Sequence, residues 1–206
     1  MDLFLRGLLI GLAIAAPVGA IGVLCIRRTL ADGRLAGLFT GLGAATADAL
    51  YGAVAGFGLT GISELLVDRQ HLIRVIGGIF LLWLGWKTWV APPPDPNAPA
   101  PPASLGRAWA TTFALTLTNP LTVLSFAAVF AGLGLAGAPN GWRGAMLLVA
   151  GVFSGSALWW LILSGGVSLV RDWFTPARML WVNRVSGAVI AGFGVLALVS
   201  EAARLF

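Results

Sequence analysis

Six long apolar segments constrain this chain more than any other feature of its sequence. Each offers the roughly 20 apolar residues that a helix needs to cross a bilayer core about 30 Å thick. Charged residues make up only 10% of the chain, whereas soluble domains carry about 25%. The sequence therefore predicts an all-α integral membrane protein with six transmembrane helices. The segments lie at about residues 4–26, 35–59, 72–90, 108–133, 143–169 and 181–200.

A proline-rich stretch divides the six segments into two groups of three. Residues 91–104 contain seven of the eleven prolines, a composition that favours an extended, semi-rigid spacer. We therefore expect a first half at 1–90, a linker at 91–107 and a second half at 108–206. Because three helices is an odd number, a second copy would insert upside down, which gives the two inverted repeats common in secondary transporters. A duplication without a transport role is the alternative.

The two halves share a weak internal similarity. GAATADALY at 43–51 aligns with GVFSGSALW at 151–159. In both halves a proline within the first segment is followed by a basic turn and then by a segment rich in small residues. The similarity supports the prediction of two inverted three-helix repeats.

Asp48 is the most informative single residue. It falls near the middle of the second apolar segment, where a charged side chain costs about 2.5–3.5 kcal/mol on insertion scales. Such a residue is expected to face the protein interior or an aqueous cavity. One interpretation is a proton carrier or a ligand for a substrate's amino group. The other is a structural carboxyl bonded to a neighbouring Thr, Asn or water.

Two prolines interrupt corresponding segments of the two halves. Pro17 and Pro120 lie within the first and fourth segments, and a proline inside a helix displaces the carbonyl four residues earlier. We expect the carbonyls of Ala13 and Thr116 to be freed, and Gly19 to loosen the first break further. Paired interruptions of this kind point to a binding site between repeats.

Polar side chains surround the second proline. Asn119 precedes it, and hydroxyl residues flank the pair. They could line a polar cavity or hydrogen-bond between helices. Ser154 and Ser156 form a weaker group on the segment that aligns with that of Asp48. The flanking hydroxyl residues are Thr116, Thr118, Thr122 and Ser125.

Small, basic and aromatic residues predict how the helices pack and insert. The Gly-x3-Gly pairs predict close helix packing. Tryptophans near segment ends predict anchors at the headgroup level, and eight basic residues against five favour both termini outside. The pairs are Gly7/Gly11, Gly37/Gly41, Gly52/Gly56 and Gly151/Gly155, and the tryptophans are Trp89, Trp109, Trp142, Trp173 and Trp181. The larger basic group is Arg27, Arg28, Arg34, Lys87, Arg107, Arg171, Arg178 and Arg184; the smaller is Arg6, Arg69, Arg74, Arg143 and Arg204.

Several classes of function lack the residues they require. Cys25 and His71 are the only cysteine and histidine, so a Cys/His metal site is not expected. No GxxxxGK[ST] motif occurs, which argues against ATP-driven pumping by this chain. The basic residues are scattered between apolar runs, as in membrane loops, rather than clustered for nucleic acid. We therefore expect no enzyme activity, no cofactor and no nucleic-acid partner, but transport energised by an ion gradient.

Five motifs in order resemble the lysine-exporter (LysE/RhtB-type) family of bacterial amino-acid exporters over nearly the whole chain. They are the Leu-Ile-Gly through Pro-Val-Gly run at 8–19 with the basic turn at 22–34, Ala-Thr-Ala-Asp-Ala-Leu at 45–50, the run at 76–85, Leu-Thr-Asn-Pro at 117–120 and Ser-Gly-Ser-Ala-Leu-Trp at 154–159. The chain departs from the family pattern at Val18-Gly19, which lacks a second proline, and at Ser125, where some basic amino-acid exporters carry an acid.

The resemblance implies a proton-coupled six-helix exporter of amino acids such as lysine or arginine. It would be a multi-pass protein of the bacterial inner membrane, with an amino acid, protons and lipid as partners, and able to form a homodimer. The alternatives are a divalent-cation exporter and a non-transporting scaffold that binds a partner through residues 91–104. The site residues expected for substrate or proton binding are Asp48, Asn119, Pro17, Gly19, Pro120, Thr46, Thr116 and Ser156.

Overall fold

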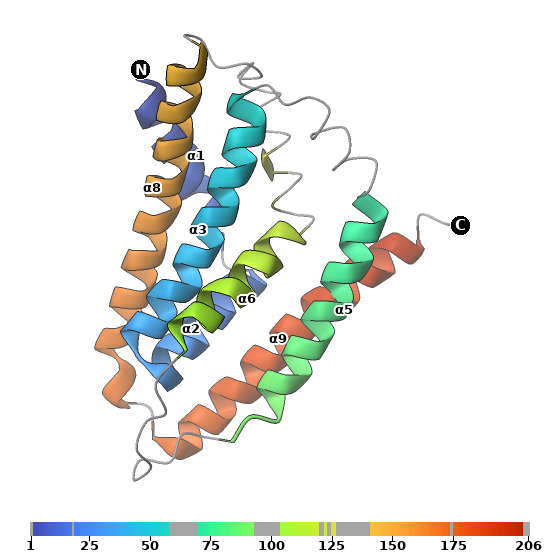
Figure 1. Cartoon of the computed structure of the whole chain (residues 1–206). Coiled ribbons are helices and arrows are strands. Elements are labelled where there is room, and N and C mark those ends of the chain that lie inside the picture. The colour runs from blue at the N-terminus through green and yellow to red at the C-terminus, as the bar shows by residue number, and fades with distance from the viewer. Residues whose placement is uncertain are drawn as a thin grey trace.

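The computed structural model describes residues 2–17, 19–57, 70–92, 104–119, 122, 125–126, 141–173 and 175–203 of the 206-residue chain. Within these ranges the regular elements are helices, with no strand (Figure 1). They are α1 (Leu3–Ala15), α2 (Ala20–Asp32), α3 (Arg34–Gly56), α5 (Gln70–Trp89), α6 (Leu105–Leu117), α8 (Gly141–Leu169), the short 3₁₀ helix η1 (Arg171–Trp173) and α9 (Pro176–Ala202).

Three of these helices are long and apolar enough to cross a membrane. They are α3, α8 and the Ala177–Ala202 part of α9, and they coincide with the second, fifth and sixth predicted segments. In α5 the apolar part, Val75–Trp89, is shorter. Most of the predicted segment 108–133 beyond α6 lies outside the described residues.

The first predicted segment differs from expectation because it is two helices rather than one. The axes of α1 and α2 are bent by 81° at the short break between them, as in a broken span or a re-entrant loop. The break falls at Pro17, which has no N–H for the helical ladder and clashes with the carbonyl one turn earlier. The interruption predicted at this proline is therefore confirmed.

The helices form two groups that are joined through the middle (Figure 1). In one group α8 packs against both α1 and α3, and in the other α5 packs along α9. Between them lie α2, which contacts α3, α8, α9 and α6, and α6, which packs mainly on α3. The bend after α1 thus directs α2 into the space between the two groups.

Reciprocal glycines bring α1 and α8 into backbone contact. A Cβ added to Gly11 would lie 2.1 Å from the Val152 carbonyl oxygen, and one added to Gly155 would lie 2.0 Å from the Leu8 carbonyl oxygen. Gly7 and Gly151 are equally crowded by backbone of the facing helix. Close packing predicted for these two Gly-x3-Gly pairs is confirmed.

A second set of glycines does the same between α5 and α9. A Cβ on Gly187 would lie 2.7 Å from the Gly85 carbonyl oxygen, and one on Gly194 would lie 2.8 Å from the Gly78 carbonyl oxygen. Each helix places its two glycines seven residues apart, so they share one face. This contact was not predicted, because the spacing is not Gly-x3-Gly.

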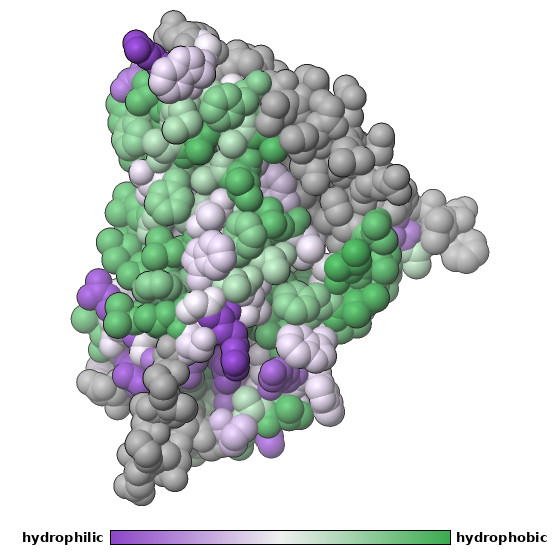
Figure 2. Space-filling model, in the orientation of Figure 1, coloured by the Kyte–Doolittle hydropathy of each residue, from purple (hydrophilic) through white to green (hydrophobic). Residues whose placement is uncertain are grey.

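Much of the described surface on the face shown in Figure 2 is apolar. Large hydrophobic side chains such as Leu147, Ile162 and Leu196 are exposed along α8 and α9, as expected for helices whose solvent is lipid. Trp142, Trp173 and Trp181 are exposed close to helix ends, in agreement with the predicted anchors. Trp109 is half-buried: its ring stacks on Phe113 at 4.9 Å and its indole N–H donates to Thr46 of α3, so its anchor role remains a prediction.

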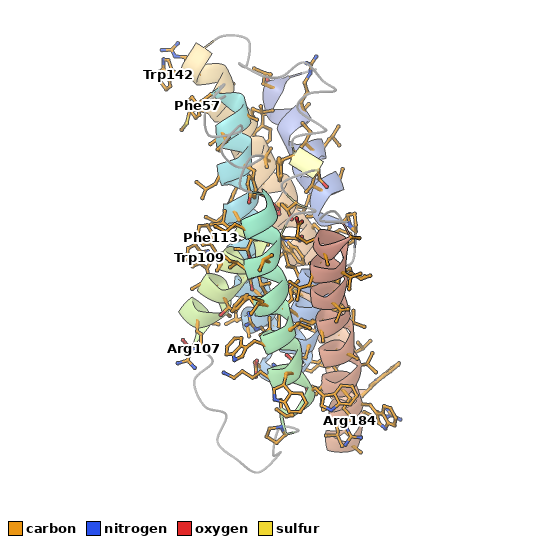
Figure 3. All side chains as sticks on the ribbon, turned by 90° about the vertical axis from the view of Figure 1, so that its right-hand side faces the viewer. Phe57, Arg107, Trp109, Phe113, Trp142 and Arg184 are labelled. Atoms are coloured by element: carbon orange, nitrogen blue, oxygen red, sulfur yellow. The ribbon has the colours of Figure 1, made fainter. Side chains whose placement is uncertain are left out.

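The helix ends that carry the larger group of eight basic residues lie together at one end of the molecule. Arg107 and Arg184 lie at this end and Phe57 and Trp142 at the other (Figure 3). The C-terminal ends of α2, α5 and α8 meet the N-terminal ends of α3, α6 and α9 there. We call it the basic end; its predicted orientation toward the inside of the cell remains a prediction.

Candidate functional site

The carboxylate of Asp48 is buried between α3 and α8. Its side chain is 3% exposed, and its Oδ2 accepts a hydrogen bond of 2.7 Å from the Ser156 hydroxyl. Ser156 in turn accepts a hydrogen bond of 3.1 Å from the Trp160 indole N–H. The three residues form a chain of hydrogen bonds that orients the serine proton toward the acid. No charged partner for Asp48 appears within the described residues, where the neutral Ser156 hydroxyl donates to it.

Beside Asp48 lies a cavity of about 400 Å³, within the size range of small-molecule sites. The bend between α1 and α2 forms one wall, and the end of α6 forms another. Trp160 and Ala44 complete the lining near the acid. The polar side chains of the lining are Asp48, Thr116, Asn119, Thr122 and Ser125.

The N-terminal turn of α2 faces this cavity. Gly19 is its N-cap residue and offers no side-chain hydrogen bond to the first N–H groups, while Gly19, Ala20 and Ile21 all line the space. A helix N-terminus carries partial positive charge, so this wall is favourable for an anion. Gly19 has φ −104° and a Cβ there would meet nothing within 4 Å, so the turn itself does not require glycine.

The second wall is the end of α6, before Pro120. The Thr116 carbonyl is not free as predicted, because it accepts a hydrogen bond of 3.2 Å from the Asn119 N–H. The turn tightens at this point and so satisfies the group that the break would have freed. Pro120 itself lies outside the described residues.

Tyr51 stabilises the same helix end from α3. Its hydroxyl donates to the Leu117 carbonyl at 2.7 Å, and its ring stacks on Phe126 with centroids 5.6 Å apart. Sequence reasoning missed this residue. A usable signal was present: Tyr51 is the only tyrosine and lies three residues after Asp48, on the same face of the helix.

At the basic end, two adjacent arginines of α2 reach different helices. The Arg28 Nη1 donates to Thr40 Oγ1 at 3.1 Å on α3, and to the Ala108 carbonyl at 3.0 Å and Thr112 Oγ1 at 3.2 Å on α6. These hydrogen bonds hold α2, α3 and α6 together between the cavity and the basic end.

The neighbouring Arg27 connects α2 to the other helix group. Its Nε donates to Asn183 Oδ1 at 2.9 Å on α9. The Asn183 amide then donates to the Ala91 carbonyl at 3.1 Å, just beyond α5. An apolar layer of Leu24, Leu115 and Ile190 lies in the same region. The helices that meet at the basic end are therefore held together by both hydrogen bonds and packing.

The structure brings most of the predicted site residues together. Five of them line the cavity and Ser156 supports one of the five from behind. Thr46 lies elsewhere: its hydroxyl accepts a hydrogen bond of 3.3 Å from the Trp109 indole, at the contact between α3 and α6. The five lining residues are Pro17, Gly19, Asp48, Thr116 and Asn119.

Apolar spanning helices around a buried acid and an interrupted helix are typical of membrane transporters. The sequence model of the LysE type translocator family matches residues 12–201. The chain belongs to this family, which confirms the resemblance. It is therefore a membrane protein of a bacterial transporter family, and the prediction that it is not an enzyme is confirmed.

Curated relatives agree with this assignment. The chain is 34% identical over 185 residues to "Uncharacterized membrane protein YahN" of Escherichia coli K12, covering 86% of this chain and 80% of that protein. It is 26% identical over 200 residues to "Putative amino acid efflux protein YcgF" of Bacillus subtilis, covering 94% of each. It is 25% identical over 172 residues to the "Threonine efflux protein" of Escherichia coli K12, covering 74% of this chain and 76% of that protein. No solved structure matched the chain.

Proposed function

We propose that this protein is a secondary transporter that exports amino acids or close analogues, driven by the proton gradient. The observation that carries the proposal is the buried Asp48 carboxylate at the wall of a 400 Å³ cavity, in a chain of a translocator family. Relatives named for amino acid and threonine efflux support the class of substrate.

The two walls of the cavity complement the two charges of an amino acid. Asp48 accepts the substrate's ammonium group or a proton, and its charge state biases the side to which the site opens. The uncapped N-terminal turn of α2 faces the substrate's carboxylate, as broken helices do in other transporters. Asn119, with an amide at the cavity wall, contributes polar contacts to the bound substrate.

The packing supports two inverted repeats, 1–90 and 108–206, joined by the linker 91–107. Asp48 and Ser156 occupy equivalent places in the alignment of 43–51 with 151–159, and they hydrogen-bond to each other. Equivalent residues meet only near the axis that relates two repeats. The contact of α1 with α8 likewise has its counterpart in the contact of α6 with α3. In this proposal the protein is a multi-pass protein of the inner membrane, surrounded by lipid.

The test is efflux of labelled amino acids from preloaded cells, comparing wild type with Asp48→Asn, with and without a protonophore. Lysine, arginine, threonine and a neutral branched amino acid are tested separately. Asp32→Asn is the matched control, because Asp32 is exposed at the end of α2, away from the cavity. We expect protonophore-sensitive efflux that Asp48→Asn abolishes and Asp32→Asn retains, at equal amounts of protein in the membrane.

Other outcomes separate the parts of the proposal. Efflux that survives Asp48→Asn would leave the exporter in place and make Asp48 a structural carboxyl. Efflux that is insensitive to the protonophore would remove proton coupling. No efflux of any amino acid would favour a divalent-cation exporter or a scaffold, and replacing residues 91–104 by a Gly/Ser spacer would then test the scaffold.

A further inference from the structure

A second cavity, of about 350 Å³, lies against the first. The two cavities share the N-terminal turn of α2, from Gly19 to Ile21, and Asn119. The second cavity extends from these shared residues to α5 and α9, and Asp48 is not among its lining residues. A molecule bound at the bend could therefore extend into both.

The chemistry of the second cavity contrasts with that of the first. Its wall is built mainly from Leu81, Leu115 and Phe193, with Leu196 at an exposed rim. Leu81 and Leu115 belong to a buried apolar cluster, and Phe193 packs against that cluster. The polar groups are hydroxyls and one amide, and no charged side chain is present among the described lining residues. A charged group placed there would lose its hydration without gaining a counter-charge, which is costly.

We propose that the second cavity is the specificity site for the substrate's side chain, with the charged ends of the same amino acid held at the bend beside Asp48. This proposal rests on the proposed function and deepens it. All amino acids present the same ammonium and carboxylate to the polar cavity, so the apolar cavity distinguishes among them. The protein then selects uncharged, mainly apolar side chains and discriminates against lysine, arginine, aspartate and glutamate.

Phe193 is the residue expected to set the length of the accepted side chain. It is the largest side chain in the described lining of the second cavity, comes from α9, and packs against the apolar cluster that contains Leu81 of α5. Replacing it with alanine enlarges the apolar space without changing the groups around Asp48. A single methylene in an apolar site changes discrimination about 10- to 200-fold, so Phe193→Ala should shift preference between short and long side chains by at least tenfold.

The experiment measures efflux of labelled alanine, threonine, leucine, phenylalanine and lysine by wild type, Phe193→Ala and the milder Phe193→Leu. Val195→Ala is the matched control, because Val195 is an exposed residue of α9 that does not line the cavity. We expect wild type to export uncharged amino acids and not lysine. Phe193→Ala should raise the ratio of phenylalanine to alanine efflux at least tenfold, Phe193→Leu less, and Val195→Ala should leave the ratio unchanged.

Two results would overturn the proposal while leaving export intact. One is efflux of lysine by wild type at a rate comparable to leucine. The other is a uniform change for all substrates in Phe193→Ala and Phe193→Leu, which would show that Phe193 does not contact the variable part of the substrate. If Phe193→Ala fails to reach the membrane, the ratio in Phe193→Leu decides alone. Absence of efflux of every amino acid by wild type would instead refute the proposed function.

Discussion

The hydrogen bonds of Arg28 should limit how often α2 separates from neighbouring helices. The accessibility of a buried cysteine on α2 can report this separation. Cys25, the only cysteine, lies on the same helix with 0% of its side chain exposed, and its thiol donates to the Gly37 carbonyl of α3 at 3.4 Å. Because Cys25 packs in a buried cluster with residues of α3 and α8, a thiol reagent reaches this sulfur only when α2 parts from these helices. We expect Arg28→Ala to increase the rate at which Cys25 is labelled.

The size of the increase follows from the geometry. All three hydrogen bonds come from one nitrogen, Nη1, which carries only two hydrogens, so they cannot count as three independent bonds. Hydrogen bonds from a charged group contribute about 1.5–3 kcal/mol each, and withdrawing the guanidinium from water offsets part of their sum. A net contribution of about 1.5–3 kcal/mol raises the open population roughly 10- to 100-fold at about 1.4 kcal/mol per factor of ten.

The assay follows labelling of Cys25 by a maleimide in native membranes, read as a mass shift on a gel. Arg28→Lys keeps the charge but loses the planar fork, so we expect an intermediate rate. Arg178→Ala is the matched control: this arginine, also at the basic end, donates to the Trp173 carbonyl at 2.7 Å, five residues earlier in its own segment. Equal labelling rates in wild type and Arg28→Ala, with the variant properly inserted, would refute the reasoning.

Two further predictions concern packing. Gly155→Ala places a methyl group 2.0 Å from the Leu8 carbonyl oxygen. It should lower the free energy of unfolding in detergent by about 1–3 kcal/mol or more, as overpacking does. The control is Gly166→Ala, whose Cβ would meet nothing within 4 Å, and this variant should unfold like wild type. Tyr51→Phe keeps the ring but removes the donor to the Leu117 carbonyl, so thermal unfolding in detergent should show a loss of about 1–3 kcal/mol, and an unchanged midpoint would contradict the role of this hydroxyl at the end of α6.

Features that depend on one helix at a time were predictable from the sequence. The apolar segments located α3, α8 and α9 to within a few residues, because the length needed to cross a bilayer is fixed by its thickness. Pro17 marked the break after α1 because its ring cannot enter the helical ladder. Asp48 drew attention because an acid at that depth needs a protein environment.

Features that depend on how two helices meet were mostly hidden. Trp109 is amphipathic and near a helix end, so nothing local predicts that its indole N–H donates to Thr46 of α3. The reach of Arg28 to Thr40 and Ala108 depends on the angle at which α2 enters after the 81° bend, which the composition of the turn does not encode. The alignment of the two halves places Asp48 and Ser156 at equivalent positions. It does not predict that α3 and α8 cross at these residues, which is what allows them to hydrogen-bond.

The glycine contacts also limit which parts of the molecule can move past one another. Where α1 meets α8 and α5 meets α9, backbone lies directly on backbone, so neither helix of a pair can rotate without driving a larger side chain into its partner. We therefore expect the two helices of each pair to move together as one rigid unit. The two units are connected through α2 and α6, which are short helices next to interruptions of the helical backbone. We expect any change of shape to occur between the two units, at α2 and the end of α6, where both cavities lie.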